Sequence, residues 1–458
     1  MDTIANSIKL LGLLLVMMYL RLFNNSSEIG SFSRLGTLLL FTSSPSRLKL
    51  VLGHIISPSQ GAFVEGRNVM HNILLCQDIV KQYGRKHCPP STLLKINLRK
   101  TCDTLESSAQ FFLILNGSPM PRFKSKRGIR QGDPMSPSIF LICMEYLSRL
   151  LKVAGNRENF RFHPRYNRLK LNHLCFADDL MIFFRGDMAS VRILLDKLRI
   201  FANSSSLVAN SSKSDMYLAG IPTSLKQYIV DSCNIPLGSM AFCYLGVPVS
   251  HKHISVVEYE RLVARMTTKI RSWKVRNLSY AARLQLVSSV LMNITNFWCQ
   301  IFVFPKKVLK QVNTICRAYL WHGKADSDTP GNMNWAKICT PKKLGGLGIR
   351  NLEVWNLVAV GKHVWHIFSM IDSMWVKWVH GVYTKGGNWR VHNISYSIKE
   401  VYHELLGVGQ PVDWAGFVWN RNSIPKARFI LWLAVNERLK SRDKLAALEL
   451  IPTDTCPL

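Results

Sequence analysis

The chain has 458 residues, and 48% of them are hydrophobic, which is enough apolar material for folded cores and excludes wholesale disorder. At about 150 residues per domain, this length predicts two or three domains. Lysine and arginine number 59 against 28 aspartates and glutamates, which gives a formal net charge of +31. Such an excess predicts a polyanionic partner, nucleic acid before an anionic membrane surface. Cations that merely keep the protein soluble are the simplest alternative.

Cysteine usage limits the redox chemistry of the chain. The 11 cysteines are scattered along the sequence and include no Cys-x-x-Cys pair. This pattern indicates neither a disulfide framework nor a complete zinc site, and it predicts mostly buried thiols in a reducing compartment. We therefore expect an intracellular location, nuclear or cytoplasmic, rather than secretion. The apolar run at 10–20 is shorter than the roughly 20 residues that cross a bilayer, so no membrane partner is expected.

The pattern of apolar residues predicts an α+β fold. Helical spacing predicts helices over 68–80, 136–153 and 190–204, and β-type runs predict strands over 93–98, 169–176, 180–184 and 244–249. After about residue 258 the chain becomes helical and rich in tryptophan and basic residues.

The strongest chemical signal is the pair Asp178-Asp179, which lies between two apolar β-type segments. A bend between strands can turn both carboxylates toward one ion, and without a cation the two charges would repel each other. Hard divalent ions such as Mg²⁺ use carboxylate oxygens together with substrate phosphates. The alternative is an ordinary polar hairpin turn, in which aspartate is common. The apolar flanks and the basic chain favour the metal site.

Two other polar segments could contact phosphates or bases. The segment 127–134, RGIRQGDP, combines glycines that permit close backbone approach with two cations and the amide of Gln131. The segment 210–214, NSSKS, is a polar turn with one cation, Lys213. By itself, each segment is better explained as a surface turn.

Together and in this order, these segments resemble the reverse transcriptase of plant non-LTR retrotransposons, the long-interspersed-element type. The resemblance covers roughly residue 48 to the end of the chain. Further boxes of the family lie at Ser57–Phe63, Lys95–Lys100, Tyr244–Pro248, Leu278–Leu284 and Gly345–Ile349.

The resemblance implies a right-hand polymerase: an α+β palm built on an antiparallel sheet with helices, then a helical basic thumb. It implies in-line attack of a primer 3′-OH on a deoxynucleotide triphosphate, with Mg²⁺ held by three aspartates, of which Asp178 and Asp179 are two. The implied partners are an RNA template and RNA–DNA hybrid.

The same resemblance assigns binding roles to other positions. Arg130, Gln131 and Gly132 would line the template and nucleotide pocket. Lys213 would lie near the incoming triphosphate, and the strand at 244–248 would lie near the primer.

The sequence departs from the family pattern in the box at Lys95–Lys100. Asn97 stands where the family has its first metal aspartate, so this ligand keeps an oxygen but loses its charge. Two unit charges at 4 Å interact by roughly 4 kcal/mol at an effective dielectric near 20, and losing that energy would slow the reaction about a thousandfold. Cys102 replaces the aromatic residue that excludes the 2′-OH of a ribonucleotide, so sugar discrimination should suffer as well.

The framework of the family is also altered. A palm helix is missing after Glu106, and no finger elements or endonuclease domain can be identified before residue 48. Residues 414–450 resemble the start of the family's zinc-binding segment, but Cys456 has no second cysteine beside it. Because one cysteine cannot hold tetrahedral zinc, we expect no structural zinc.

The predicted domains follow from these boundaries. They are a degenerate or unstructured segment at 1–47, palm and partial fingers at 48–250, a thumb- or connection-like helical region at 251–394, and a truncated zinc-binding-like segment at 395–458.

The sequence therefore predicts an RNA-directed DNA polymerase that is impaired or inactive. The alternative is a catalytically dead nucleic-acid-binding remnant or a pseudogene product. Basic residues from Lys269 to Arg350 could supply phosphate contacts. Four tryptophans are interleaved with them, and for these alone burial in a helical core is the better explanation: Trp273, Trp298, Trp321 and Trp335. The oligomeric state is not indicated.

Overall fold

The computed structural model describes residues 45–439 apart from 86–87, 99–109, 112–113, 116–117, 120–122, 125–127, 130–131, 164–166, 240, 253, 274–277, 328, 385–394 and 408. The chain divides into two compact units. The first combines Met1–Lys252 with Met370–Asn388, and the second combines His253–Ser369 with Trp389–Leu458. The predicted palm helix deletion and Cys102 lie outside the described residues.

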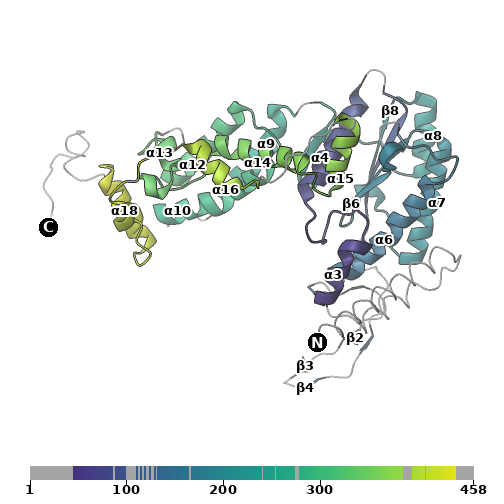
Figure 1. The fold of residues 1–458 in the computed structure, drawn as a ribbon, viewed down its shortest axis with the longest axis horizontal. Helices are drawn as coiled ribbons and strands as arrows, with labels where there is room; N and C mark the ends of the chain where they lie inside the picture. The colour runs from purple at the N-terminus through teal and green to yellow at the C-terminus, as the bar shows by residue number, and fades with distance from the viewer. Residues whose placement is uncertain are drawn as a thin grey trace. The chain divides into compact units, whose positions relative to one another are not determined.

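A four-stranded antiparallel sheet forms the centre of the first unit, in the order β6-β7-β1-β8. Its strands are β1 (Ser91–Asn97), β6 (His173–Phe176), β7 (Asp179–Arg185) and β8 (Asp215–Ala219). The helices of this unit are α3 (Pro45–Ile55), α4 (Val69–Val80), α6 (Ser136–Gly155), α7 (Met188–Ser205), α8 (Thr223–Cys233) and α15 (Met374–Val379). The predicted α+β class is confirmed (Figure 1).

Alternation along β1 distributes its side chains between the two faces of the sheet. Leu94 and Ile96 are buried with Ile182 of β7 in one hydrophobic core, to which α6 and α7 contribute. Lys95 and Asn97 belong to the opposite face of the same strand. Burial of Leu94 and Ile96 in this core therefore fixes the face of the sheet on which Lys95 and Asn97 lie.

The predicted elements differ from the observed ones in two places. The run 244–249, expected as one strand, is a hairpin of β9 (Ala241–Tyr244) and β10 (Val247–Ser250). It reverses because Leu245 and Gly246 both take positive φ angles, 49° and 83°. The strand expected over 169–176 begins only at His173, after a 3₁₀ turn at Asn167–Leu169.

A segment from late in the chain completes the first unit. Met370–Asn388 falls inside the helical region expected at 251–394, but its described part joins the first unit. There α15 packs on α4, where Asp78 accepts hydrogen bonds from Trp378 Nε1 and from the hydroxyl of Tyr383, both at 2.6 Å. This segment is thus bonded to α4, from which it is distant in sequence.

The described part of the second unit is helical. Its elements are α9 (Val256–Ser272), α10 (Tyr280–Leu286), a π-helical turn (Val287–Leu291), α11 (Met292–Cys299), α12 (Lys306–His322), α13 (Trp335–Cys339), α14 (Leu352–Phe368), α16 (Ile398–Leu406), α17 (Ala415–Val418) and α18 (Pro425–Val435). Trp298 and Trp321 are buried, 5% and 4% exposed, so the core explanation of these two side chains is confirmed. Trp432 of α18 donates from Nε1 to the carbonyl of Gly345 at 2.8 Å, which docks α18 on the Gly345–Ile349 box.

Candidate functional site

The hairpin between β6 and β7 carries the two adjacent aspartates. Phe176 pairs with Asp179 at the end of the ladder, and Ala177 and Asp178 form the turn. Ala177 has φ of 53°, in the left-handed region that a residue with a Cβ seldom adopts. This backbone places Asp178 and Asp179 together at one end of the sheet, as the sequence predicted.

Asn97 lies directly across from Asp179 in the neighbouring strand. The two residues are register partners of β1 and β7, and Asn97 Nδ2 donates to Asp179 Oδ1 at 3.3 Å. The structure therefore brings together the three positions that the sequence assigned to one site: Asn97, Asp178 and Asp179.

The polar turn that contains Lys213 is bonded to Asn97 through the backbone. Asn97 N–H donates to Ser214 Oγ at 3.2 Å, and its carbonyl accepts from Asn210 N–H at 2.8 Å. Ser214 Oγ also donates to the Asn210 carbonyl at 2.7 Å, which closes the turn. Lys213 is exposed on this turn, so its cation is available to an anion beside the strand end.

Burial and charge oppose each other at Asp179. Its pKa is raised, first because burial disfavours the charged carboxylate and further because the charge of Asp178 is close. The hydrogen bond from Asn97 and the ammonium of Lys95 act in the opposite direction. Lys95 itself lies 4.0 Å from an oxygen of Asp215 and 5.8 Å from the centre of the Phe242 ring. The amide of Asn97 and the ammonium of Lys95 thus partly offset the effects that raise the pKa of Asp179.

Other predicted binding residues are only partly described. Gly132 has φ of 84°, a conformation that favours glycine, and the carboxylate of Asp133 then accepts from Met135 N–H at 2.8 Å just before α6 begins. Arg130 and Gln131 lie outside the described residues, as does Cys102. Their assigned roles stay predictions.

The loop at Ser57–Ala62 is a contributor to the site for which the sequence suggested no role. It lies along β6, with Gln60 and Cys175 as a parallel bridge. Cys175 N–H donates to the Ser59 carbonyl and Gly61 N–H donates to the Cys175 carbonyl, both at 2.8 Å. Gln60 Oε1 then accepts from Ala177 N–H at 3.2 Å, in the turn that carries the aspartates.

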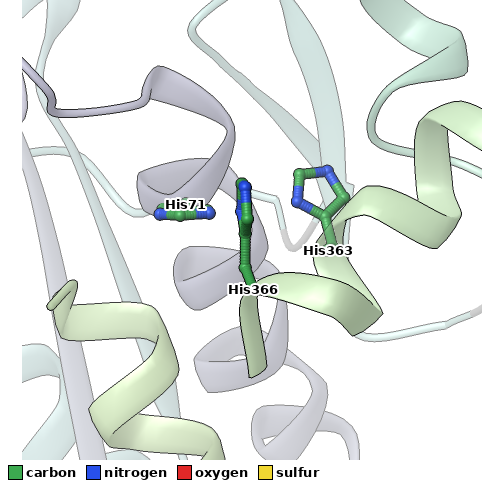
Figure 2. A group of neighbouring side chains, drawn as sticks. All are labelled: His71, His363 and His366. Atoms are coloured by element: carbon green, nitrogen blue, oxygen red, sulfur yellow. The ribbon is translucent and has the colours of Figure 1, made fainter. Parts of the chain in front are cut away.

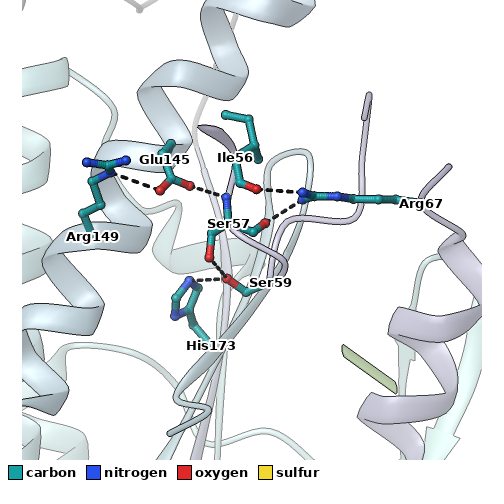
Figure 3. A network of polar contacts seen from close by, with 7 residues as sticks. All are labelled: Ile56, Ser57, Ser59, Arg67, Glu145, Arg149 and His173. Atoms are coloured by element: carbon teal, nitrogen blue, oxygen red, sulfur yellow. Dashed lines mark hydrogen bonds and ion pairs between the residues drawn. The ribbon is translucent and has the colours of Figure 1, made fainter. Parts of the chain in front are cut away.

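Charged side chains hold this loop from both sides (Figure 3). Buried Glu145 of α6 accepts from Ser57 N–H at 2.7 Å and from Arg149 Nε at 3.1 Å. Arg67 donates to the carbonyls of Ile56, Ser57 and Gln60, each at 2.6 Å. Burial is the main reason that the pKa of Arg67 is lowered, against the raising effects of Glu145 and Asp372.

Ser59, His173 and Asn172 are connected like a nucleophile, a base and an orienting group, but they are sealed in the core. Asn172 Nδ2 donates to the Leu151 carbonyl at 2.6 Å, so its oxygen faces His173 Nδ1 at 2.7 Å and must accept. His173 Nε2 therefore accepts from Ser59 Oγ at 2.9 Å. Burial lowers the pKa of His173 to about 3, and the three residues are 1–3% exposed. The chain is a structural network without access for a substrate.

The donor set fits one hard divalent cation through carboxylate oxygens. Asp178 and Asp179 are adjacent and half-buried, and the charge of Asp178 contributes to the raised pKa of Asp179. Because the carboxylate of Asp179 can only accept, Asn97 must present its NH₂ group to it and is used there as a donor rather than as a ligand. The two carboxylates therefore fit Mg²⁺, and the third ligand position does not.

Two histidines of the second unit, His363 and His366, share one helix, α14 (Figure 2). Their rings lie 5.9 Å apart, and His363 Nε2 lies 2.6 Å from the Gln300 carbonyl. Burial lowers the pKa of both, to about 4 for His366. His71, also drawn in Figure 2, belongs to α4 of the first unit and stacks on Trp375 at 5.2 Å. Two histidines on α14 are fewer than the four ligands of a structural zinc site.

Comparison with known proteins assigns two segments of the chain to families. Residues 44–249 match the model of reverse transcriptase (RNA-dependent DNA polymerase). Residues 44–249 form a reverse transcriptase domain. Residues 396–458 match a second model, zinc-binding in reverse transcriptase. The resemblance drawn from the sequence motifs is confirmed.

Parts of the chain are also similar to individual proteins. The chain is 24% identical over 336 residues, 65% of its length and 30% of the relative, to a Retrovirus-related Pol polyprotein from a type-2 retrotransposable element of Drosophila melanogaster. It is 42% identical over 67 residues, 14% of its length and 55% of the relative, to an uncharacterised mitochondrial protein of Arabidopsis thaliana. A telomerase from Candida albicans, solved with a fragment of telomeric RNA, aligns with a TM-score of 0.28 and 13% identity over 61% of this chain and 51% of that one.

The matches cover only parts of longer proteins. The chain spans about half or less of the length of the curated relatives that it matches. Among the helices in the part of the chain that the structure describes, none combines the length and apolar character that crossing a membrane takes.

Proposed function

We propose that the reverse transcriptase domain of this chain is an RNA-directed DNA polymerase whose nucleotidyl transfer is impaired at Asn97. The single observation that carries the proposal is the hydrogen bond from Asn97 Nδ2 to Asp179 Oδ1 at 3.3 Å. It occupies an oxygen of the carboxylate pair with a donor, at the position where the family resemblance expects a third carboxylate.

In this proposal the first unit supplies the palm, with Asp178 and Asp179 as the residues that would hold Mg²⁺. When bound, the ion would neutralise phosphate charge and stabilise the attacking and leaving oxygens. Lys213, exposed on the turn bonded to Asn97, would contact the triphosphate of a deoxynucleotide. Arg130, Gln131 and Gly132 would line the template and nucleotide pocket, and Cys102 would leave the sugar poorly discriminated. Losing one ligand charge would weaken nucleotidyl transfer, whereas the binding of nucleic acid would be retained.

The second unit supplies the alternative function, which is binding of RNA template and RNA–DNA hybrid without chemistry. Its exposed cations include Lys269, Lys306, Lys307 and Lys310. Because phosphate contacts depend on cations and not on the metal site, binding can persist when catalysis fails. In this role the second unit acts as a thumb-like region.

We propose no structural zinc, although the family model over residues 396–458 is described as zinc-binding. The sequence of this matched segment contains one histidine, His403, and one cysteine, Cys456. Two ligands cannot satisfy tetrahedral zinc. Metal analysis of the purified protein tests the point, and stoichiometric zinc would contradict it.

Primer extension and binding measured side by side test the proposed function. With Mg²⁺ and an RNA template, primer extension by the wild-type protein should not exceed that of the Asp178→Ala variant. The wild-type protein should bind RNA–DNA hybrid as well in EDTA as it does in Mg²⁺. Robust extension that disappears in Asp178→Ala would show an active polymerase and overturn the impairment. Well-folded protein that binds no hybrid would leave the pseudogene alternative.

A further inference from the structure

We propose that Gln60 is a positioning residue for the aspartate pair, acting through the backbone of Ala177. The inference rests on the proposed function only for its consequence on metal binding. Its structural part concerns how the turn at Ala177-Asp178 is held, and it can be measured whether or not the protein polymerises.

The amide of Gln60 is built into the hairpin that carries the aspartates. Its residue is 1% exposed, and Oε1 accepts from both Ala177 N–H, at 3.2 Å, and Ala62 N–H, at 3.1 Å. One oxygen thereby ties the loop to itself and to the turn. Among the described residues, Nε2 of the same side chain has no hydrogen-bond partner. The oxygen is thus the part of this buried amide that the fold uses.

The hydrogen bond from Ala177 N–H to Gln60 Oε1 is made by a residue with a strained backbone conformation. Ala177 adopts φ of 53°, which costs a residue with a Cβ roughly 1–2 kcal/mol. The β6–β7 ladder ends with the pair Phe176–Asp179, so Ala177 N–H lies beyond it. Its donation to Gln60 gives this backbone an anchor next to Asp178 and Asp179.

The loop that presents Gln60 is itself fixed. Gly61 packs so closely on Asn72 that an added Cβ would collide with the Asn72 amide, which donates to the Cys175 carbonyl at 3.0 Å. Arg67 and Glu145 hold the preceding residues of the loop through charge-assisted hydrogen bonds (Figure 3). Through its bond to Gln60, the turn at Ala177 is therefore held in a fixed position relative to the loop and to α6. A preorganised turn keeps both carboxylates aimed at one cation.

The test compares Gln60→Met, which keeps the side-chain length and removes the acceptor, with Gln77→Met. Gln77 is a glutamine of α4 in the same unit, and its Nε2 has no hydrogen-bond partner among the described residues. Hydrogen exchange is followed at the Ala177 amide, with the Phe183 amide of β7 as internal reference, since Phe183 N–H donates to the Asn172 carbonyl away from the turn. Ala177 exchange should become roughly tenfold faster in Gln60→Met alone, while Phe183 stays protected.

A second readout separates positioning from mere stability. The affinity for Mn²⁺, measured by electron paramagnetic resonance, should fall several-fold in Gln60→Met and stay unchanged in Gln77→Met. Gln60→Glu, which retains an acceptor oxygen, should keep the Ala177 amide protected. If wild-type protein binds no Mn²⁺, the metal part of the proposed function fails, and Ala177 exchange still decides the role of Gln60.

Two results would overturn the proposal. One is Ala177 exchange in Gln60→Met that equals wild type while Phe183 remains protected. The other needs no variant and applies even if Gln60→Met fails to fold: an Ala177 amide that exchanges in the wild-type protein at the rate of a free peptide.

Discussion

Asn97 and Asp179 face each other across β1 and β7, with the amide of one donating to the carboxylate of the other at 3.3 Å. A metal-binding aspartate at position 97 would repel Asp179 until a cation arrived. With asparagine there, the pair is attractive without any ion. In the proposed metal site, asparagine at this position would therefore remove a ligand and at the same time relieve the repulsion that a metal would otherwise compensate.

Asn97→Asp should make the protein dependent on a divalent cation for stability. In EDTA the variant should lose roughly 1–3 kcal/mol of unfolding free energy, because a like charge replaces the donor to Asp179. Adding Mg²⁺ or Mn²⁺ should raise the free energy of unfolding more in the variant than in wild type, as measured by chemical denaturation. Primer extension should gain little, since the comparison with the family pattern predicts that a palm helix is missing after Glu106.

Asn210→Asp is the matched control, because it adds the same charge in the adjacent turn without facing Asp179. Equal responses of Asn97→Asp and Asn210→Asp to divalent cations would show that the contact with Asp179 is not special. A large gain of extension in Asn97→Asp would show that Asn97 alone disables the enzyme.

The strands and the turn of this site can be predicted from the local sequence, but the contact between Asn97 and Asp179 cannot. Apolar runs around Asp178-Asp179 are enough to predict two strands and a turn, because alternation and turn preference are local properties. The pairing of Asn97 with Asp179 joins positions 82 apart, and a period of two gives the face of a strand but not its neighbour. Only the family resemblance predicts that these residues share a site.

Gln60 could not be assigned a role from its pattern. Its partner Ala177 lies 117 positions away, and a glutamine in a loop has no periodicity that indicates burial. Arg67 and Glu145 were missed for the same reason, since buried charges read as surface residues in a sequence. In contrast, the segment 244–249 failed on local chemistry: Leu245 takes the left-handed conformation that its type disfavours, so the turn was not visible.

His173 should make the first unit sensitive to acid. Its pKa is about 3 in the folded protein and about 6.5 unfolded, so between these values the unfolded state binds a proton that the folded state rejects. Its contribution to stability is therefore complete above pH 6.5 and is lost as the pH falls toward 3, at up to about 1.4 kcal/mol per pH unit. His173→Gln, which does not titrate, should flatten this slope in denaturation measured from pH 7 to 4.5. His403→Gln, at an exposed histidine of α16, should leave the slope as in wild type; a slope unaffected by His173→Gln contradicts the argument.

Trp432 should decide whether α18 stays docked in the second unit. Its ring is fully buried, and Nε1 donates to the Gly345 carbonyl. Trp432→Phe should cost about 1–2 kcal/mol through that hydrogen bond, and Trp432→Ala about 3–5 kcal/mol through the cavity as well. Trp419→Phe is the control, because its Nε1 bonds the Lys342 carbonyl at 3.2 Å from a partly exposed ring, and it should cost less. Proteolytic release of the segment after Ser397 reports the loss of docking, and equal rates for both phenylalanine variants would exclude an anchoring role for Trp432.

The last prediction concerns binding of nucleic acid by the second unit. Lys306, Lys307 and Lys310 are exposed on the first turns of α12, and among the described residues no carboxylate lies within 4.0 Å of any of the three. Cations at the start of a helix add to the positive end of its dipole, so this turn is an attractive position for phosphate. We expect sequence-independent binding to RNA and RNA–DNA hybrid that weakens steeply with salt.

Reversing these three charges should identify their share of the salt dependence. If each lysine neutralises one phosphate, Lys306→Glu, Lys307→Glu and Lys310→Glu together should reduce the slope of log affinity against log salt by about two to three. The matched control reverses Arg192, Lys197 and Arg199 of α7, which changes the net charge equally on a helix of the first unit. Asp178→Ala should leave the slope unchanged, because the carboxylate pair contributes no cation to the contact. Fluorescence anisotropy across a salt series measures all of these slopes, and an equal reduction by the α7 control would show that net charge, rather than the start of α12, determines binding.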